Sequence, residues 1–249
     1  MRLLLIAFQF LTIIPLPVGL RCEKEDLGRA TAFFPLAGLA IGGMLAAANW
    51  LISPWIVRPL CDALLITLLA LITGALHLDG LADVCDGLAA RGGRERFLAV
   101  MKDSQVGAVG AVGLVLGLLL KWQALVAVPT EFKWQALLFF PALARFGQVL
   151  TMTGARHARQ DGLGAAIAQG TGKTALFLAF ATAVSAGCYL LGIKGGGVAL
   201  VAVCLLTFAG RTFFQRKLGG VTGDTIGCIS ELNEILTLLV ISAVPLTGY

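Results

Sequence analysis

The densest group of potentially reactive side chains in the sequence is a run of aspartates near residue 80. Asp79, Asp83 and Asp86 are spaced i, i+4 and i+7. If this segment is helical, the spacing places all three within about 60° of one another on one face. Carboxylates this close repel one another in a low dielectric unless a cation holds them together. Their hard oxygens suit Mg²⁺, Mn²⁺ or Ca²⁺ better than zinc, so we expect a divalent metal site.

Residues near this run extend the expected site. Asp103 would complete the metal shell, while Lys102 and Ser104 beside it would contact a phosphate. The same three residues also fit an ordinary helix N-cap, so the segment alone leaves both interpretations open. Gly80 and Gly87 would leave room for a bulky substrate group to approach the helix backbone.

A second candidate segment is the glycine-rich stretch 219–227. Backbone N–H groups at Thr222 and Gly223, at the start of a helix, would offer a phosphate the positive end of the helix dipole. Asp224 and Glu231 share one side of that helix, and we expect both as further metal ligands. The alternative is a capping box followed by a polar packing face.

Basic residues would supply the positive charge that an anionic substrate needs. Arg156 and Arg159 suit bidentate phosphate contacts, and Arg91 follows the aspartate run. The alternative for these arginines is anchoring at the membrane surface. Arg145 lies inside an apolar run, so we expect it to face other helices and to pair with an acid such as Glu231.

The sequence does not separate the general base from the metal ligands. The candidates for catalysis are His77 and an uncoordinated carboxylate among Asp83, Asp86 and Asp103. On an ideal helix His77 lies about 160° from Asp79. It therefore suits a packing role as well as it suits a ligand or a base.

The amino-acid composition indicates that the chain lies in a lipid bilayer. Hydrophobic residues make up 58% of the 249-residue chain and charged residues 13%, with a mean hydropathy of +0.89. We expect a single all-α domain over 1–249, a polytopic transmembrane bundle in a lipid bilayer. The short apolar segment before Pro15 and Pro17 reads as an interfacial or re-entrant helix. About seven apolar runs are long enough to span, at 30–53, 61–78, 106–128, 133–153, 173–193, 195–210 and 226–246.

Basic residues between these runs predict the orientation. With the N-terminus inside, the inner segments hold fourteen of them: Arg2, Arg21, Lys24, Arg29, Arg91, Arg94, Arg96, Lys102, Arg156, Arg159, Lys173, Arg211, Arg216 and Lys217. The outer loops hold only Arg58, Lys133 and Lys194. The positive-inside rule then places the polar segments 79–105, 154–172 and 211–225 together on the cytoplasmic face of the membrane. This scatter of basic residues argues against nucleic acid, although the net charge is +5.

Two other readings fit the sequence less well. Asp83-x-x-Asp86-Gly87-x-x-Ala90-Arg91 matches the first half of the CDP-alcohol phosphotransferase motif, but Gly107 stands where its last aspartate belongs. A transporter would have ionisable residues deep in several spans and an inverted repeat, and the sequence shows no such repeat. Glycines at 107, 110, 113 and 117 permit association into a homo-oligomer and equally permit internal packing.

Several motifs together resemble the cobalamin synthase family along almost the whole chain. They are FLTIIPLP, FFPLAGLAIG, HLDGLADVCDG, MKDSQVGAVG, ARHARQDGLG and GGVTGDTIGCISELNE. The resemblance implies an inner-membrane, magnesium-dependent transferase of the late corrinoid pathway. Its corrinoid nucleotide substrate, adenosylcobinamide-GDP, would condense with α-ribazole or α-ribazole 5′-phosphate. The products would be adenosylcobalamin or its phosphate, and GMP.

Overall fold

The computed structural model describes residues 1–15, 24–158, 167 and 170–243, and almost all of them are helical. In these ranges the only β contact is an isolated bridge between His157 and Val221. The predicted all-α fold is therefore confirmed. The elements are α1 (Arg2–Leu11), α2 (Lys24–Ala30), η1 (Thr31–Phe33), α3 (Phe34–Ile52), α4 (Arg58–Ile72), α5 (Leu76–Ala89), α6 (Gly93–Val100), α7 (Ala108–Ala127), η2 (Thr130–Phe132), α8 (Lys133–Met152), α10 (Lys173–Leu218) and α11 (Gly223–Ala243).

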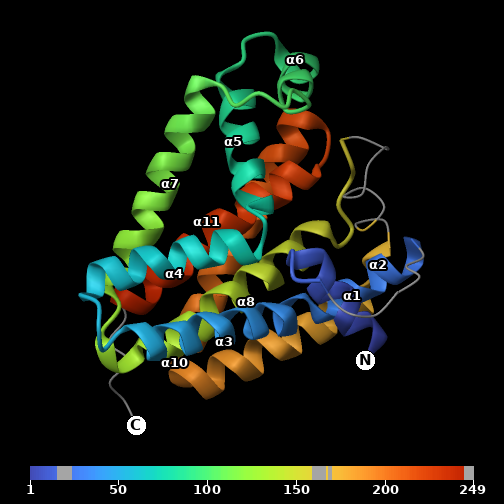
Figure 1. Cartoon of the computed structure of the whole chain (residues 1–249). Helices are drawn as coiled ribbons and strands as arrows, with labels where there is room; N and C mark the ends of the chain where they lie inside the picture. Colours follow the sequence, from blue (N-terminus) through green and yellow to red (C-terminus); the bar gives the residue numbers. More distant parts are fainter. Residues whose placement is uncertain (16–23, 159–166, 168–169, 244–249) are drawn as a thin grey trace.

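Helix α8 forms the centre of the bundle and is buried along almost its whole length. It packs against α3, α10 and α11 (Figure 1). Glycines on α3 allow the closest of these approaches: a Cβ atom on Gly38 would lie 2.6 Å from the Cα of Ala142. Small residues let helix backbones meet in lipid, where no hydrophobic effect drives helices together.

Four helices are long and apolar enough to cross a membrane, or five if the bent pair α4–α5 crosses as one span. These helices indicate an integral membrane protein, but the predicted count of about seven spans is not confirmed. The expected spans 173–193 and 195–210 together form the 46-residue element α10. This element turns back at Gly192, where φ is 70°, and Gly187 and Gly196 meet on either side of the turn: a Cβ on Gly196 would lie 2.5 Å from the Gly187 carbonyl.

The second expected span, 61–78, does not continue straight into the aspartate run. The chain bends by 91° between α4 and α5. Gly74 and Ala75 both adopt positive φ, 59° and 55°, and a new helix begins at Leu76. Much of the polar segment 79–105 lies in helices α5 and α6. The three aspartates nevertheless keep helical spacing, now on α5.

The glycines of α7 serve internal packing. A Cβ on Gly113 would lie 2.4 Å from the Cys85 sulfur, and one on Gly117 would lie 2.9 Å from a methyl group of Leu81. These contacts join α7 to α5, while the opposite side of α7 exposes valines and leucines. Association into a homo-oligomer stays a prediction.

Helix α1 is short, as expected for the segment before Pro15. It buries Ala7 and Leu11 completely and packs against α2 and α3. Just beyond it, the Ile13 amide donates to the Ile72 carbonyl at 2.9 Å, which ties this segment to the end of α4.

Candidate active site

Three polar segments meet at one end of the bundle, as their charges predicted. Arg94 at the start of α6 donates to the Leu218 carbonyl at 2.7 Å, and so caps the end of α10, and to the Ala158 carbonyl at 3.1 Å. Ala158 and Val221 join the second and third segments through an N–H···O bond of 3.0 Å. Arginine at the carbonyl end of a helix also complements the helix dipole. The sequence identified Arg94 only as one of the basic residues of the inner segments, and not as a helix cap.

Helices α5 and α11 cross with their backbones in contact, and this crossing builds a pocket. A Cβ on Gly80 would lie 2.6 Å from the Asp224 carbonyl oxygen, so Gly80 packs against α11 instead of leaving room for a substrate. The space beside Gly87 is likewise filled by the Phe97 ring. The pocket beside the crossing has a volume of about 160 Å³. It is lined by Phe10, Phe34, Leu76, His77, Asp79, Gln148, Met152, Ile167, Gly223, Asp224, Ile226 and Gly227.

Four of the predicted site residues therefore share one pocket: His77, Asp79, Gly223 and Asp224. Asp79 is exposed and Asp224 half-buried, so two carboxylates from different helices border the same space. Asp83 lies one turn beyond Asp79 on α5 and is half-buried. This pairing across two helices is what the aspartate spacing on its own did not reveal.

The start of α11 uses the capping arrangement that we had considered as the alternative to phosphate binding. The Thr222 amide donates to the Thr225 hydroxyl at 2.8 Å, and the Thr225 amide donates to the Thr222 hydroxyl at 3.2 Å. These bonds occupy Thr222, one of the predicted phosphate-binding residues. Gly223 remains exposed at the pocket, with no atom within 4 Å of a Cβ built on it.

Asp86 has a structural task that the sequence did not show. Its two carboxylate oxygens accept hydrogen bonds from the amides of Gly107 and Gly110, each at 2.8 Å. The aspartate thus caps the first turn of α7 from the neighbouring helix α5. A carboxylate at a helix N-terminus also interacts favourably with the helix dipole.

We expect Asp86→Asn to lower the free energy of unfolding by about 1–2 kcal/mol, because an amide loses one of the two bonds and the negative charge. Thermal unfolding in detergent measures this loss. Asp103→Asn is the matched variant, since Asp103 accepts one bond, from the Gln105 amide at 3.1 Å on an exposed turn. An equal loss in the two variants would contradict the capping role of Asp86.

The predicted phosphate-binding residues Arg91, Lys102, Ser104 and Arg156 are all exposed at this end of the bundle. Arg159 lies outside the described residues. Beside Arg156, partial burial lowers the pKa of His157 below its ordinary value, which favours the neutral imidazole. These side chains are exposed to solvent, and their roles in phosphate binding stay predictions.

The six carboxylates expected as metal ligands do not gather at one point. In the ranges that the structure covers, no group of three or more His, Cys, Asp or Glu side chains is placed to hold one metal ion. Asp79 and Asp224 share the pocket, Asp86 caps α7, and Asp103 accepts a bond within its own turn. Glu231 lies inside the bundle, bonded to a lysine.

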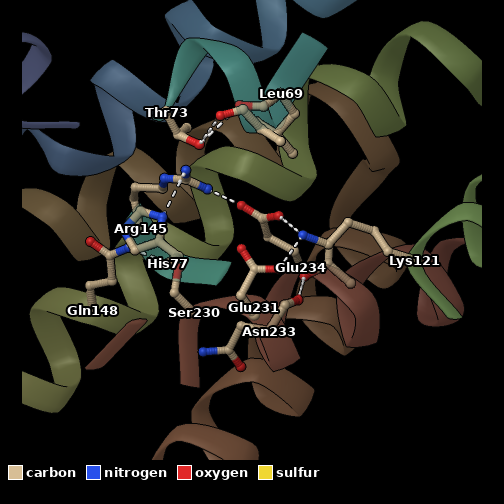
Figure 2. Close-up of polar contacts among 12 residues, drawn as sticks. Leu69, Thr73, His77, Lys121, Arg145, Gln148, Ser230, Glu231, Asn233 and Glu234 are labelled. Atoms are coloured by element: carbon tan, nitrogen blue, oxygen red, sulfur yellow. Dashed lines mark hydrogen bonds and ion pairs between the residues drawn. The ribbon is translucent and has the colours of Figure 1, made fainter. Parts of the chain in front are cut away.

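Four buried charges connect three helices behind the pocket (Figure 2). Lys121 of α7 contacts Glu231 and Glu234 of α11, each at 2.5 Å. Arg145 of α8 pairs with the other oxygen of Glu234. We expected Arg145 to pair with an acid such as Glu231, and its partner is the acid one turn further along. The two cations and two anions balance, which is what permits their burial.

His77 joins the pocket to these four charges. Gln148 Nε2 lies 2.8 Å from His77 Nε2 and donates to the Ser230 hydroxyl at 2.7 Å. The other ring nitrogen, Nδ1, lies 3.5 Å from an Arg145 nitrogen. Both ring nitrogens thus face side chains within the bundle, as Figure 2 shows. This arrangement favours a positioning role for His77 over that of a general base, which stays untested. Gln148 and Ser230 were not anticipated, because single polar residues in apolar runs carry little signal.

Comparison with known proteins places the chain in a family. Residues 3–242 match the family model described as cobalamin-5-phosphate synthase. A relative from Geotalea daltonii is 59% identical over 245 residues, which cover 98% of each chain. Relatives from Clostridium botulinum and Caldanaerobacter subterraneus are 34% and 31% identical, each covering at least 95% of both chains. All three are named adenosylcobinamide-GDP ribazoletransferase. No solved structure matches. The matches run nearly from end to end, and the chain belongs to the cobalamin-5-phosphate synthase family.

Proposed function

We propose that this chain is an adenosylcobinamide-GDP ribazoletransferase of the inner membrane, with its active site on the cytoplasmic face. The observation that carries the proposal is the 59% identity to a protein of that name over 98% of both chains. The polar end of the bundle supports it, because the exposed cations there suit a substrate that carries phosphates.

The proposed reaction is a phosphoryl transfer in which one bond replaces another. A hydroxyl oxygen of α-ribazole, or of α-ribazole 5′-phosphate, attacks the cobinamide-bearing phosphorus of adenosylcobinamide-GDP. The P–O bond to GMP breaks, GMP leaves with the bridging oxygen, and a new phosphodiester joins ribazole to cobinamide. The hydroxyl proton passes to a base, for which the carboxylates on the open face of α5 are the candidates.

The pocket provides ligands that suit Mg²⁺. This ion is commonly held by one or two carboxylates together with substrate phosphates and water. Asp79 and Asp224 are two carboxylates from different helices at one pocket, so they would hold the ion, with Asp83 one turn away. When bound, Mg²⁺ would neutralise charge on the phosphate oxygens.

Other residues of the chain would position the substrates. Arg91, Lys102 and Arg156 are exposed where the three polar segments meet, and they would pair with the phosphates of the incoming nucleotide. Gly223 leaves open space at the pocket, which lets a phosphate approach the first turn of α11. His77, held by Gln148, would fix the start of α5 so that Asp79 faces Asp224.

Purified protein in lipid tests the proposal directly. With adenosylcobinamide-GDP, α-ribazole and Mg²⁺ we expect GMP release and a corrinoid product in equal amounts, measured by chromatography. EDTA should abolish turnover, and excess Mg²⁺ should restore it. Replacing α-ribazole by its 5′-phosphate identifies the preferred acceptor. The absence of GMP release with either acceptor would exclude the proposed activity. Full activity in EDTA would show that turnover does not require Mg²⁺.

A further inference from the structure

The pocket between α5 and α11 has an apolar side that the proposed metal and phosphate chemistry does not use. Phe10 of α1 and Phe34 of α3 both line it. Their rings stack nearly in parallel, with centroids 5.7 Å apart and 11° between the planes. Leu76 and Ile226 line the same pocket from the helices that carry Asp79 and Asp224. A ligand in this pocket therefore meets both carboxylates and an aromatic, apolar wall.

The size and chemistry of the pocket restrict what it accepts. Its volume of about 160 Å³ is several times the roughly 10–15 Å³ that one water molecule needs on the same measure. This space has room for one fused bicyclic ring. A guanine ring against Phe10, Phe34 and Leu76 would need its polar edge to reach Asp79, Gln148 or Asp224, because the apolar side chains offer no hydrogen bonds and unpaired buried polar groups are costly. A benzimidazole is mostly apolar and presents a flat face for stacking.

We infer that Phe10 and Phe34 form the subsite for the benzimidazole base of α-ribazole. The inference rests on the proposed function and adds to it the residues that select the acceptor substrate. With the base against the aromatic wall, the attached ribose extends toward the side of the pocket that Asp79 and Asp224 border. The attacking hydroxyl then lies where the phosphate of the other substrate is bound.

The attachment of α1 supports this role. Ile13, just after α1, donates its amide to Ile72, and one of its methyl groups lies 2.5 Å from where a Cβ on Gly74 would be. Phe10 is therefore positioned relative to the bend at Gly74, which lies three residues before His77. This connection makes the short first helix part of the site as well as part of the bundle.

The test compares Phe10→Ala with Phe8→Ala. Both residues lie on α1, are partly buried and pack against the apolar core, but only Phe10 also lines the pocket. We expect Phe10→Ala to raise KM for α-ribazole about ten- to a hundredfold, the range for loss of base–aromatic stacking. KM for adenosylcobinamide-GDP should change less than threefold. Phe10→Trp should restore most of the affinity for α-ribazole, and Phe10→Leu should restore little.

Each outcome decides the inference. An unchanged KM for α-ribazole in Phe10→Ala, or a rise confined to adenosylcobinamide-GDP, would overturn it, as would an equal effect in Phe8→Ala. Thermal unfolding of each variant identifies a general loss of structure, and the Trp variant then decides, because simple destabilisation predicts no selective rescue of KM.

Failure of the inference is distinguishable from failure of the proposed function. If wild-type protein releases no GMP, the proposed function fails, and calorimetric binding of α-ribazole alone then tests the subsite. Binding to wild type that is weakened in Phe10→Ala but not in Phe8→Ala supports the subsite. The absence of binding to such an inactive wild type overturns it.

Discussion

Replacing Glu234 with glutamine is expected to lower the free energy of unfolding by about 3–5 kcal/mol, because it removes the counterion of a buried arginine. Arg145 is 0% exposed and Glu234 1%. One carboxylate oxygen of Glu234 pairs with Arg145 and the other with Lys121. Lys121 keeps Glu231 in the variant, whereas no second carboxylate pairs with Arg145 in the part of the chain that the structure describes. The loss of stability therefore comes from leaving the Arg145 guanidinium buried without a counterion.

Thermal unfolding in detergent measures this loss. For a chain of this size about 1 kcal/mol corresponds to a shift of roughly 2–4 °C, so the midpoint should fall by on the order of 10 °C. Arg2→Met is the matched control, because Arg2 pairs with Asp26 at 2.6 Å but is 54% exposed. Exposed pairs contribute about 0–1 kcal/mol, so this control should change the midpoint by only a few degrees.

A double variant separates loss of balance from loss of contact. Arg145→Met with Glu234→Leu removes one cation and one anion together and leaves the Lys121–Glu231 pair at 2.5 Å. Replacing a complete buried pair with apolar residues of similar volume is often neutral, so we expect much of the stability to return. A double variant as unstable as Glu234→Gln would show that charge balance is not what holds these helices.

This network also shows how far the sequence predicts structure. Arg145 and Glu231 stood out because ionisable residues inside apolar runs are rare, so burial and pairing were predictable. The choice of partner was not. Glu231 and Glu234 are three residues apart on one helix face, and only the packing of α8 against α11 decides which one Arg145 reaches.

The aspartate run likewise has features that the sequence predicts and contacts that it does not. Helical spacing on α5 was readable from the sequence, and so was the meeting of the polar segments, because both depend on local periodicity and on charge. What each aspartate does in the structure depends on neighbouring helices, which the spacing within α5 does not specify. The amides of Gly107 and Gly110 bind Asp86, and the crossing at Gly80 places Asp224 at the pocket that Asp79 also lines. The bend at Gly74 was missed because a single glycine in an apolar run indicates it only weakly.

Asp79→Asn and Asp224→Asn are each expected to lower kcat by between about 100- and 1,000-fold, the range for removing one group that stabilises charge in a transition state. Either change removes half of the negative charge that the pocket offers to Mg²⁺. The variants should also need more Mg²⁺ for half-maximal activity. Thermal midpoints should stay close to wild type, because Asp79 is exposed and Asp224 half-buried at the rim of the bundle.

Glu131→Gln is the matched control for these two variants. Glu131 is an exposed acid in η2, far along the chain from α5 and α11, and the same loss of one charge there should leave kcat within about twofold. Asp83→Asn discriminates between two arrangements of the site. If it abolishes activity while Asp79→Asn does not, the acid that pairs with Asp224 lies one turn further along α5. If Asp224→Asn keeps full activity, the α11 side of the pocket takes no part in the reaction, and the metal would have to be held by α5 alone.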